Sequence, residues 1–416
     1  MTFRQAEEYL LALELFGMRF GLDRMRKLMT AMGSPQQDFE SIHVVGTNGK
    51  SSTVRFCAAI LQRHGLATGS YTSPHLGSFR ERVEVEETPV SEADFAAAVD
   101  RAARAAALVD RTAAADDRVT QFEAVTATAY SELSRRGVEV AVVEAGLGGR
   151  YDATNVIDSR VQVLTGVGLE HTRWLGPTVE DIAEEKLAVV RDGSVLVTTP
   201  ALDAGVERVA ERAVAEREAR WVRSAPVPRP GLVMRAAGDF QRHNFALAAA
   251  AAREFLGREL DPAAVADAAG QTLVAGRMDV VGQEPLTVFD GAHNEAGAEA
   301  LAGSLDGVLG GRRPRIGVIG VLDDKDAAAM LGVLLPRLDR VVFTRPANPR
   351  SLSPATLLSL AEKQGARAET VADPRDALHR ARRLAGPDGA VVATGSIYLI
   401  ADLVRDRSSD ARASRL

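Results

Sequence analysis

The chain has 416 residues, of which 46% are hydrophobic and 25% charged, and its formal net charge is −6 at pH 7. A chain of this length rarely builds a single core, so the composition predicts a globular protein of two domains. The mildly acidic balance argues against a nucleic-acid-binding surface, and the sequence contains no run of about 18 apolar residues that could span a membrane.

Cysteine usage and the N-terminus bear on location. Cys57 is the only cysteine, so no disulfide can form within the chain, which favours a reducing cytoplasm. Residues 1–8 are charged and lack the apolar stretch of a signal peptide. Cys57 lies on the apolar face of a predicted helix, so we expect a buried structural thiol.

Residues 42–52, Ile-His-Val-Val-Gly-Thr-Asn-Gly-Lys-Ser-Ser, join an apolar run to a glycine-bearing turn, and a helix is expected over residues 53–64. Glycines let backbone N–H groups approach phosphate oxygens, and the positive end of a following helix favours an anion. Lys50 supplies a charge for the outer phosphates, and the Ser51 hydroxyl can ligate Mg²⁺. Val44 stands where the common motif has its first glycine. The loop therefore indicates a nucleotide, with ATP preferred, and a plain surface turn is the alternative.

Apolar runs alternate with helical patterns over most of the chain, which predicts an α/β fold with parallel strands buried under helices. The expected strands are residues 138–144, 161–167, 195–199, 286–290, 315–321, 340–344 and 390–394. The expected helices include residues 91–111, with Ser91 as N-cap, and residues 179–191, 240–256 and 353–364.

Domain limits follow from turn-forming residues. The first domain is expected over residues 1–280 and the second over residues 286–405, because residues 278–286 hold a glycine and a proline before a new βα unit. The proline-rich residues 225–231 are interpreted as a loop within the first domain. The charged residues 406–416 are expected to form a frayed tail.

Glu144 closes the expected strand 138–144 and precedes three glycines. The carboxyl ends of parallel strands line the crevice where α/β sheets bind ligands, so Glu144 can share a Mg²⁺ with Ser51. A glycine-rich turn with a solvated glutamate is the alternative.

His171 follows the expected strand 161–167, where an imidazole can ligate a metal or exchange a proton, although a lone histidine is more often structural. The pattern Ile-Ala-Glu-Glu-Lys at residues 182–186 favours the solvated, charged face of a helix. Asp290 closes another strand and can bond ribose hydroxyls, and His293 and Asn294 follow it at a helix start.

In combination, these motifs resemble folylpolyglutamate synthase, including the bacterial form that doubles as dihydrofolate synthase, within the Mur ligase superfamily. The resemblance runs from about Tyr9 to Asp402. The motifs that carry it are residues 46–52, 72–76, 81–83, 144–155 and 175–186, the Gln241/Asn244 element, Gly276-Arg277, and residues 290–294 and 394–399.

The resemblance implies an N-terminal P-loop ATPase-like domain with a parallel sheet and a smaller C-terminal Rossmann-like domain. It implies a ligase that uses ATP and two Mg²⁺ ions to add L-glutamate to folates, through an acyl phosphate, and that can also convert dihydropteroate to dihydrofolate. The expected partners are therefore small molecules, with neither nucleic acid nor membrane, and we expect a monomer.

The resemblance also assigns roles to matching residues. Those implied to hold the nucleotide are Gly46, Thr47, Asn48, Gly49, Lys50, Ser51, Ser52, Asn244, Arg277 and Asp290. Those implied to bind metal are Ser51, Glu144, His171 and Lys186, with Lys186 carbamylated. Those implied to be catalytic are Lys50, His171, Lys186 and His293. Those implied to contact the substrate are Ser73, Pro74, His75, Arg82, Phe122 and Asp152.

Two positions depart from the family pattern. Glu170 stands where the family usually has aspartate, and Leu187-Ala188-Val189 follow Lys186 where the family commonly has Ala-Gly-Ile. Neither departure removes an implied ligand.

Two other functions are weighed. A Mur-type ligase for another carboxylate, such as a peptidoglycan precursor, usually carries a longer N-terminal domain than the residues before the loop at 46 allow. A nucleotide-gated regulator would be expected to lack Lys50, Glu144 or His171, and all three are present.

Overall fold

The computed structural model describes residues 1–14, 21–114, 117–226 and 231–405, and the chain divides into two compact units. Unit 1 comprises Met1–His75, Phe79–Val233 and His243–Thr272. Unit 2 comprises Leu76–Ser78, Met234–Arg242 and the chain from Leu273 onward. The boundary expected at residues 278–286 therefore lies inside unit 2. The expected tail at 406–416 and most of the expected loop at 225–231 lie outside the described residues.

Unit 1 is built on an eight-stranded sheet. Its strands are β1 (Glu40–Val45), β2 (Thr68–Tyr71), β3 (Val83–Val85), β4 (Thr88–Pro89), β5 (Val140–Glu144), β6 (Val161–Leu164), β7 (Val195–Thr198) and β8 (Arg220–Arg223). They lie in the order β4-β3-β2-β5-β1-β6-β7-β8. The strand β3 pairs antiparallel with both β2 and β4, and all the other pairs are parallel. Val44 of β1 lies opposite Glu144 of β5, which brings that carboxylate to the strand end where the glycine loop begins.

The helices of this part of the chain are α1 (Phe3–Ala12), α2 (Asp23–Ala31), η1 (Pro35–Gln37), α3 (Lys50–Arg63), η2 (Phe79–Arg82), α4 (Glu92–Asp110), α5 (Gln121–Arg135), η3 (Ala153–Val156), α6 (Thr172–Leu175), α7 (Val179–Leu187), α8 (Ala204–Glu216), α9 (Asp239–Leu256) and α10 (Pro262–Gln271). Ser91 caps α4 by accepting the Asp94 N–H, as predicted. The α7 helix ends at Leu187, short of the expected residue 191, and Val189 and Val190 beyond it are buried in the core.

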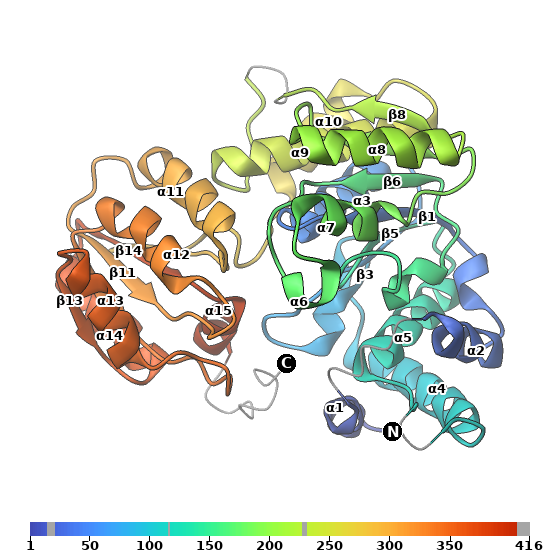
Figure 1. Cartoon of the computed structure of the whole chain (residues 1–416), viewed down its shortest axis with the longest axis horizontal. Helices are drawn as coiled ribbons and strands as arrows, with labels where there is room; N and C mark the ends of the chain where they lie inside the picture. The colour runs from blue at the N-terminus through green and yellow to red at the C-terminus, as the bar shows by residue number, and fades with distance from the viewer. Residues whose placement is uncertain (15–20, 115–116, 227–230, 406–416) are drawn as a thin grey trace. The chain divides into compact units, whose positions relative to one another are not determined.

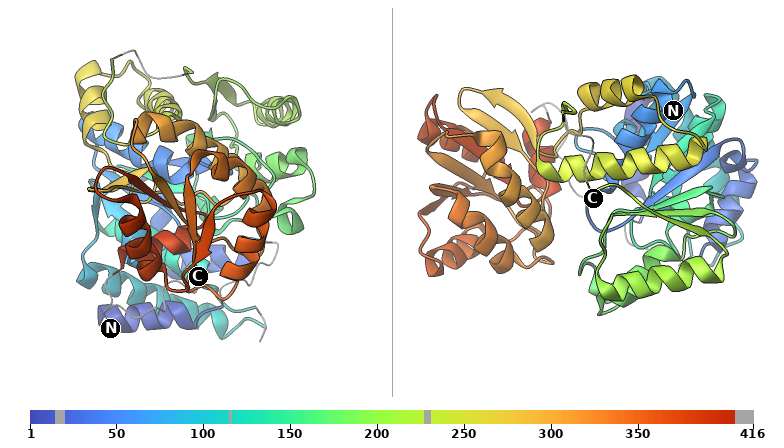
Figure 2. Two further views of the ribbon diagram at one scale, coloured as in Figure 1. Left: turned by 90° about the vertical axis from the view of Figure 1, so that its left-hand side faces the viewer. Right: turned by 90° about the horizontal axis from the view of Figure 1, so that it is seen from above.

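Helices cover the sheet of unit 1. Apolar residues of α7 and α8 pack against Val45, Leu164 and Leu196 of the sheet. In the right-hand view of Figure 2, α8 lies on one side of this sheet and α9 and α10 lie on the other. Phe56 of α3 and Phe245 of α9 meet edge to face, with ring centroids 5.3 Å apart. Cys57 of α3 is fully buried, which confirms the structural thiol.

Unit 2 contains a six-stranded sheet made of β9 (Asp279–Gln283), β10 (Leu286–Phe289), β11 (Arg315–Ile319), β12 (Arg340–Phe343), β13 (Ala368–Thr370) and β14 (Ala390–Thr394). The order is β13-β12-β11-β14-β10-β9, with only β9 antiparallel to its neighbour. Residues 279–283, expected in a boundary segment, instead form β9 and pair with β10 across a short turn at Glu284 and Pro285.

Helices cover both faces of the unit 2 sheet (Figure 1). The helices are α11 (Glu295–Leu309), α12 (Ala327–Leu334), η4 (Leu335–Arg337), α13 (Pro354–Lys363), α14 (Pro374–Ala385) and α15 (Ile397–Val404). The core on one face draws on α11, α12 and α13, and the core on the other draws on α14 and α15. The two units thus confirm the predicted α/β class with parallel-rich sheets.

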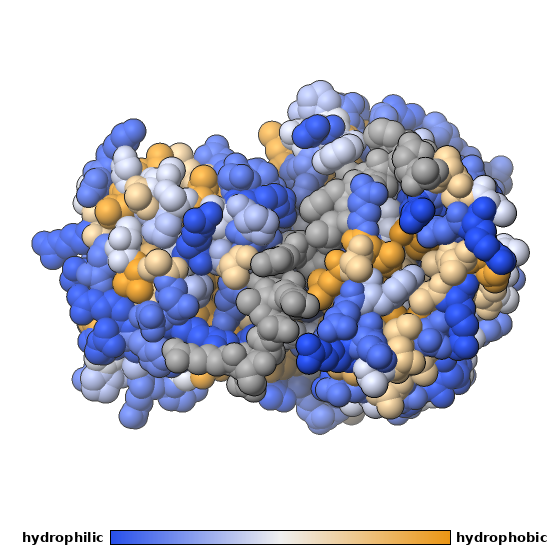
Figure 3. Space-filling model, turned by 90° about the horizontal axis from the view of Figure 1, so that it is seen from below, coloured by the Kyte–Doolittle hydropathy of each residue, from blue (hydrophilic) through white to orange (hydrophobic). Residues whose placement is uncertain are grey.

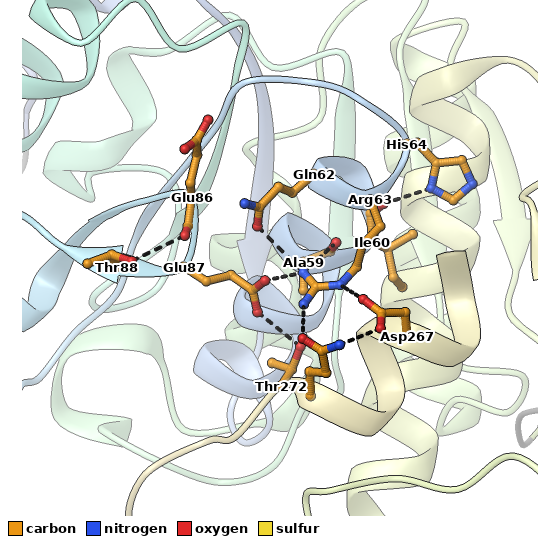
Figure 4. A network of polar contacts seen from close by, with 11 residues as sticks. Ala59, Ile60, Gln62, Arg63, His64, Glu86, Glu87, Thr88, Asp267 and Thr272 are labelled. Atoms are coloured by element: carbon orange, nitrogen blue, oxygen red, sulfur yellow. Dashed lines mark hydrogen bonds and ion pairs between the residues drawn. The ribbon is translucent and has the colours of Figure 1, made fainter. Parts of the chain in front are cut away.

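Arg63, at the end of α3, joins that helix to α10 (Figure 4). Its guanidinium forms ion pairs with Glu87, in the turn after β3, and with Asp267 of α10, the latter at 2.8 Å. Thr272 Oγ1 donates to the same Glu87 carboxylate at 3.1 Å. The helix that begins at Lys50 is therefore fixed at its far end to the last helix of unit 1.

On the face drawn in Figure 3, hydrophilic residues predominate and hydrophobic residues occur in smaller groups. Of the helices in the described ranges, none combines the length and apolar character needed to cross a bilayer.

Candidate active site

The glycine loop connects β1 to α3, and its geometry requires glycine. Gly46 has φ of 148°, and a Cβ there would lie 1.9 Å from Thr165 Oγ1. Gly49 has φ of 85°, and a Cβ there would lie 2.5 Å from Asn244 Oδ1. Both positions combine a left-handed backbone with close packing, which only glycine tolerates. The structure therefore brings Asn244 of α9 against the loop.

The rest of the loop is fixed by the turn after β6. The Thr47 N–H donates to Gly166 O at 2.9 Å, and the Thr165 hydroxyl donates to Asn48 O at 2.6 Å. Ser52 is buried in the first turn of α3. The first N–H groups of α3 have no partner within the helix and lie at the positive end of its 14 residues, an arrangement that suits phosphate.

Two lysines donate to the same carbonyl of the loop. Lys50 Nζ donates to Gly46 O at 3.0 Å and to Thr47 O at 3.1 Å. Lys186 Nζ, from α7, donates to Gly46 O at 2.8 Å and to Glu170 Oε1 at 2.9 Å. The pattern-based interpretation of Lys186 as a solvated residue is wrong, because its side chain is only 1% exposed. It lies on the helix face that also buries Ala183 and Leu187.

The electrostatics of this pair follow from its burial. Burial lowers the pKa of Lys186 to about 8, and the charge of Glu170 opposes this only in part. Burial alone would raise the pKa of Glu170, but the charges of Lys186 and Lys50 outweigh it and lower that pKa to about 2. The glutamate that replaces the family's aspartate is therefore ionised and reaches the lysine.

Ser51 and Glu144 are in contact. Ser51 Oγ donates to Glu144 Oε1 at 3.0 Å, and the Ser73 N–H donates to Oε2 at 3.1 Å. Within the described ranges, His, Cys, Asp and Glu nowhere form a group of three or more that could hold a metal alone. Mg²⁺ commonly uses one or two protein oxygens together with phosphates and water, so the hydroxyl and carboxylate fit this ion.

His171 is the N-cap of α6, with φ of 47°, and its side chain is exposed. It follows Glu170 directly, so it lies beside the Glu170–Lys186 pair in the chain. A non-glycine residue in the left-handed region is uncommon and accumulates at functional sites.

Two expected substrate residues support each other after the Ser73–Pro74 peptide, which is cis. Arg82 Nε donates to His75 Nδ1 at 3.0 Å, and both side chains are buried. Phe79 lies against both, with its ring centroid 4.4 Å from that of His75 and 5.2 Å from the Arg82 guanidinium carbon. Within unit 1 these contacts shape the loop that begins at Ser73.

Phe122 and Asp152 meet the turn after Glu144 from two sides. A Cβ on Gly146 would lie 2.5 Å from the Phe122 ring, so glycine is needed for this approach. Asp152 is 6% exposed, and its Oδ2 accepts the Leu147 N–H at 2.8 Å. The structure thus brings both expected substrate residues to one turn.

Within unit 2, Arg277, Asp290 and His293 gather around the turn after β10. Asp290 accepts the N–H groups of Met278 and Ala292, each at 2.8 Å. Burial raises the pKa of Asp290, and the charge of Arg277 opposes the shift. A Cβ on Gly291 would lie 2.5 Å from Arg277 Nη1, and His293 Nδ1 donates to Gly291 O at 2.9 Å.

Thr165 is a site residue that sequence reasoning missed. Its hydroxyl fixes Asn48, and its side chain blocks any Cβ on Gly46. The available signal was a threonine inside the expected strand 161–167, and a single hydroxyl there is too common to stand out.

Comparison with known proteins shows the family of the chain. The family described as Mur ligase, glutamate ligase domain, matches residues 276–397. Dihydrofolate synthase/folylpolyglutamate synthase of Mycobacterium tuberculosis is 35% identical over an alignment 427 positions long, which covers 90% of this chain and 88% of that protein.

Solved structures are similar over the whole length. Folylpolyglutamate synthase of Mycobacterium tuberculosis complexed with ADP matches with a TM-score of 0.90 and 31% identity, covering 97% of this chain and 98% of that one. The bifunctional folylpolyglutamate synthase/dihydrofolate synthase of Yersinia pestis, complexed with AMPPNP and Mn ion, matches with a TM-score of 0.84 and 28% identity, covering 96% and 97%. The chain therefore belongs to the folylpolyglutamate synthase/dihydrofolate synthase family and carries the glutamate ligase domain of the Mur ligases.

Proposed function

We propose that this protein is an ATP- and Mg²⁺-dependent ligase that adds L-glutamate to folates such as tetrahydrofolate, and that also converts dihydropteroate to dihydrofolate. The observation that carries the proposal is the glycine loop, where Lys50 and Ser51 open α3 and Ser51 contacts the buried Glu144. Relatives named for both activities support it, one of them 35% identical over 90% of the chain.

The reaction we propose has two covalent steps. A carboxylate oxygen of the acceptor attacks the γ-phosphorus of ATP, ADP leaves, and an acyl phosphate forms. The amine of glutamate then attacks the acyl carbon, and the tetrahedral intermediate expels phosphate and loses the amine proton to give the amide. Phosphoryl transfer depends mainly on positioning and charge neutralisation. Lys50 would leave its carbonyl partners for the outer phosphates, and the first N–H groups of α3 would hold the others.

Ser51 and Glu144 would hold one Mg²⁺, which when bound neutralises phosphate charge and orients the phosphoryl group. His171 and Lys186 would serve a second ion, with Lys186 carbamylated. Only a neutral amine reacts with CO₂, and the lowered pKa of Lys186 supports a neutral fraction near pH 8. The carbamate would be an oxygen donor of the kind that Mg²⁺ prefers.

The remaining residues would divide between nucleotide and acceptor. Asn244 lies against Gly49, which supports a contact with ATP. Arg277 would contact the nucleotide, Asp290 would bond its ribose, and His293 would lie beside the phosphates or the incoming glutamate. The acceptor would lie along Phe122, Asp152, Arg82 and the loop of Ser73, Pro74 and His75. The matched relatives are named for folates, so another acceptor such as a peptidoglycan precursor is not favoured.

We also propose that the enzyme acts as a monomer in the cytoplasm. The single, fully buried Cys57 supports a reducing compartment, because it offers no disulfide within the chain.

The test is ADP release by the purified protein with ATP, Mg²⁺ and L-glutamate, run in parallel with tetrahydrofolate and with dihydropteroate. We expect ADP in both assays and a folate product one glutamate longer. ADP with tetrahydrofolate alone would limit the protein to polyglutamylation. Absence of ADP with either acceptor would overturn the proposal.

A further inference from the structure

A buried histidine contacts Thr154, close to the turn at residues 145–149 that Phe122 and Asp152 contact. His43 is in the middle of β1, the strand that leads into the glycine loop, and it is fully buried. Its Nε2 lies 2.8 Å from the hydroxyl of Thr154, at the start of η3. Burying an imidazole in the middle of a core strand costs more free energy than burying an apolar side chain, so we expect this one to have a specific role.

Counting protons assigns the direction of each hydrogen bond. The Thr154 hydroxyl has one proton and donates it to Asp152 Oδ1. It can therefore only accept from His43, which makes His43 the donor through Nε2–H. His43 Nδ1 has no hydrogen-bond partner in the parts of the chain that the structure describes. That is tolerable for an unprotonated nitrogen and costly for a buried N–H group.

The imidazole is held neutral. Burial is the main cause that lowers the pKa of His43 to about 3, and the charge of Arg191 adds to it. The Arg191 guanidinium itself donates hydrogen bonds to Asn155 and to Ile157 O. His43 thus remains a fixed neutral donor across the pH range in which the enzyme would work.

The carboxylate of Asp152 accepts hydrogen bonds from residues before and after it in the chain. Its Oδ1 accepts the Thr154 hydroxyl and the Thr154 N–H, the latter at 3.0 Å, and its Oδ2 accepts the Leu147 N–H at 2.8 Å. Burial raises the pKa of this carboxyl, and these hydrogen bonds oppose the shift. The relay from His43 therefore ends on the turn that Phe122 contacts through Gly146.

We propose that His43 is a positioning residue for the acceptor site, acting through Thr154 to fix the carboxylate of Asp152 and the turn at residues 145–149. This inference rests on the proposed function, because it assigns Asp152 and Phe122 to the acceptor. Glu144, which opens the same turn, is held separately by Ser51 and Ser73. The effect of His43 should consequently fall on the acceptor more than on ATP.

Three variants test the proposal in the full-length enzyme. His43→Leu removes the donor and keeps an apolar filling, whereas His43→Gln restores an N–H donor at a similar reach. Tyr130→Phe is the matched control, because Tyr130 donates to the backbone oxygen of Thr154 at 2.9 Å and lies outside the relay. We expect His43→Leu to raise the KM for the acceptor about 10-fold or more, because Thr154 and Asp152 lose the donor that holds them in place.

The comparison separates positioning from a general loss of stability. In His43→Leu the KM for ATP should stay near the wild-type value, His43→Gln should recover most of the acceptor affinity, and Tyr130→Phe should leave the acceptor KM unchanged. A merely structural role would lower the active fraction, and hence kcat, without a selective change in the acceptor KM. An unchanged acceptor KM in His43→Leu, or the same shift in Tyr130→Phe, would overturn the inference.

A second measurement does not depend on activity or on the folding of a variant. Nitrogen-15 NMR of the histidine-labelled wild-type enzyme should show His43 as the neutral Nε2–H tautomer at pH 5. A cationic ring or an Nδ1–H tautomer would refute the relay. Absence of ADP release by an intact wild-type protein would instead count against the proposed function.

Discussion

The buried pair of Lys186 and Glu170 offers a sharp energetic test. Both side chains are almost fully buried, at 1% and 8% exposure, and their charged atoms lie 2.9 Å apart. Glu170→Leu would leave the Lys186 ammonium with Gly46 O as its remaining partner of those described above. Removing one partner of a buried ion pair costs about 3–5 kcal/mol, because the remaining group must either stay charged without its partner or change its protonation state. We expect the same order of loss for Lys186→Met.

The double variant Glu170→Leu/Lys186→Met decides whether burial is the cause. Replacing both charges by apolar groups of similar size is often neutral, so the double variant should be more stable than either single one.

An exposed ion pair serves as the control. Arg4 and Glu8 of α1 form such a pair at 3.1 Å, and Glu8→Ala should cost only about 0.3–0.5 kcal/mol.

Urea unfolding at pH 7 in CO₂-free buffer measures these differences, and the single variants should also lower the thermal midpoint by roughly 10 °C. Single variants within about 0.5 kcal/mol of the wild type, a size typical of surface changes, would refute the reasoning. Losses that simply add in the double variant would also refute it.

Three further outcomes follow from the structure. Lys50→Ala should lower the rate of ADP release about 100-fold or more, as loss of a preorganised charge does, with the fold intact by circular dichroism; full turnover would contradict the phosphate role. Arg63→Ala should lower the free energy of urea unfolding by about 1–3 kcal/mol, because the carboxylates of Glu87 and Asp267 lose their partner. An unchanged free energy of unfolding would show that the contact between α3 and α10 does not stabilise the fold. Glu170 has its pKa lowered, so it stabilises the fold above its ordinary pKa of 4.5, and this stability should be lost as the pH falls toward 2. A Glu170→Gln variant with the same acid dependence as the wild type would contradict this.

The core of the fold could be predicted from the sequence because its strands are buried on both faces. The runs at 138–144 and 390–394 are almost wholly apolar, and they appear as β5 and β14. Edge strands escaped prediction for the opposite reason. β8 has exposed arginines at both ends and only half-buried residues between them, and β9 combines exposed valines with a glycine, so neither has the buried, apolar pattern of a central strand.

The site was only partly visible in the sequence. Ser51 and Glu144 could be paired because Glu144 ends one strand and Ser51 opens the helix after the loop that follows another. The ends of neighbouring parallel strands meet at one edge of a sheet. The burial of Lys186 could not be read from its helix, since a lysine beside two glutamates normally faces water. His43 was hidden inside an apolar run, and its importance depends on a contact with Thr154, 111 residues away.

The central claim is that ATP cleavage is tied to amide formation between a folate and glutamate. The most direct measurement is the ratio of ADP released to glutamate incorporated into the folate product, with ATP, Mg²⁺, L-glutamate and either tetrahydrofolate or dihydropteroate. We expect equal amounts of ADP and new amide, and no ADP when the acceptor is left out. ADP release that does not depend on the acceptor, or no ADP with either acceptor, would contradict it.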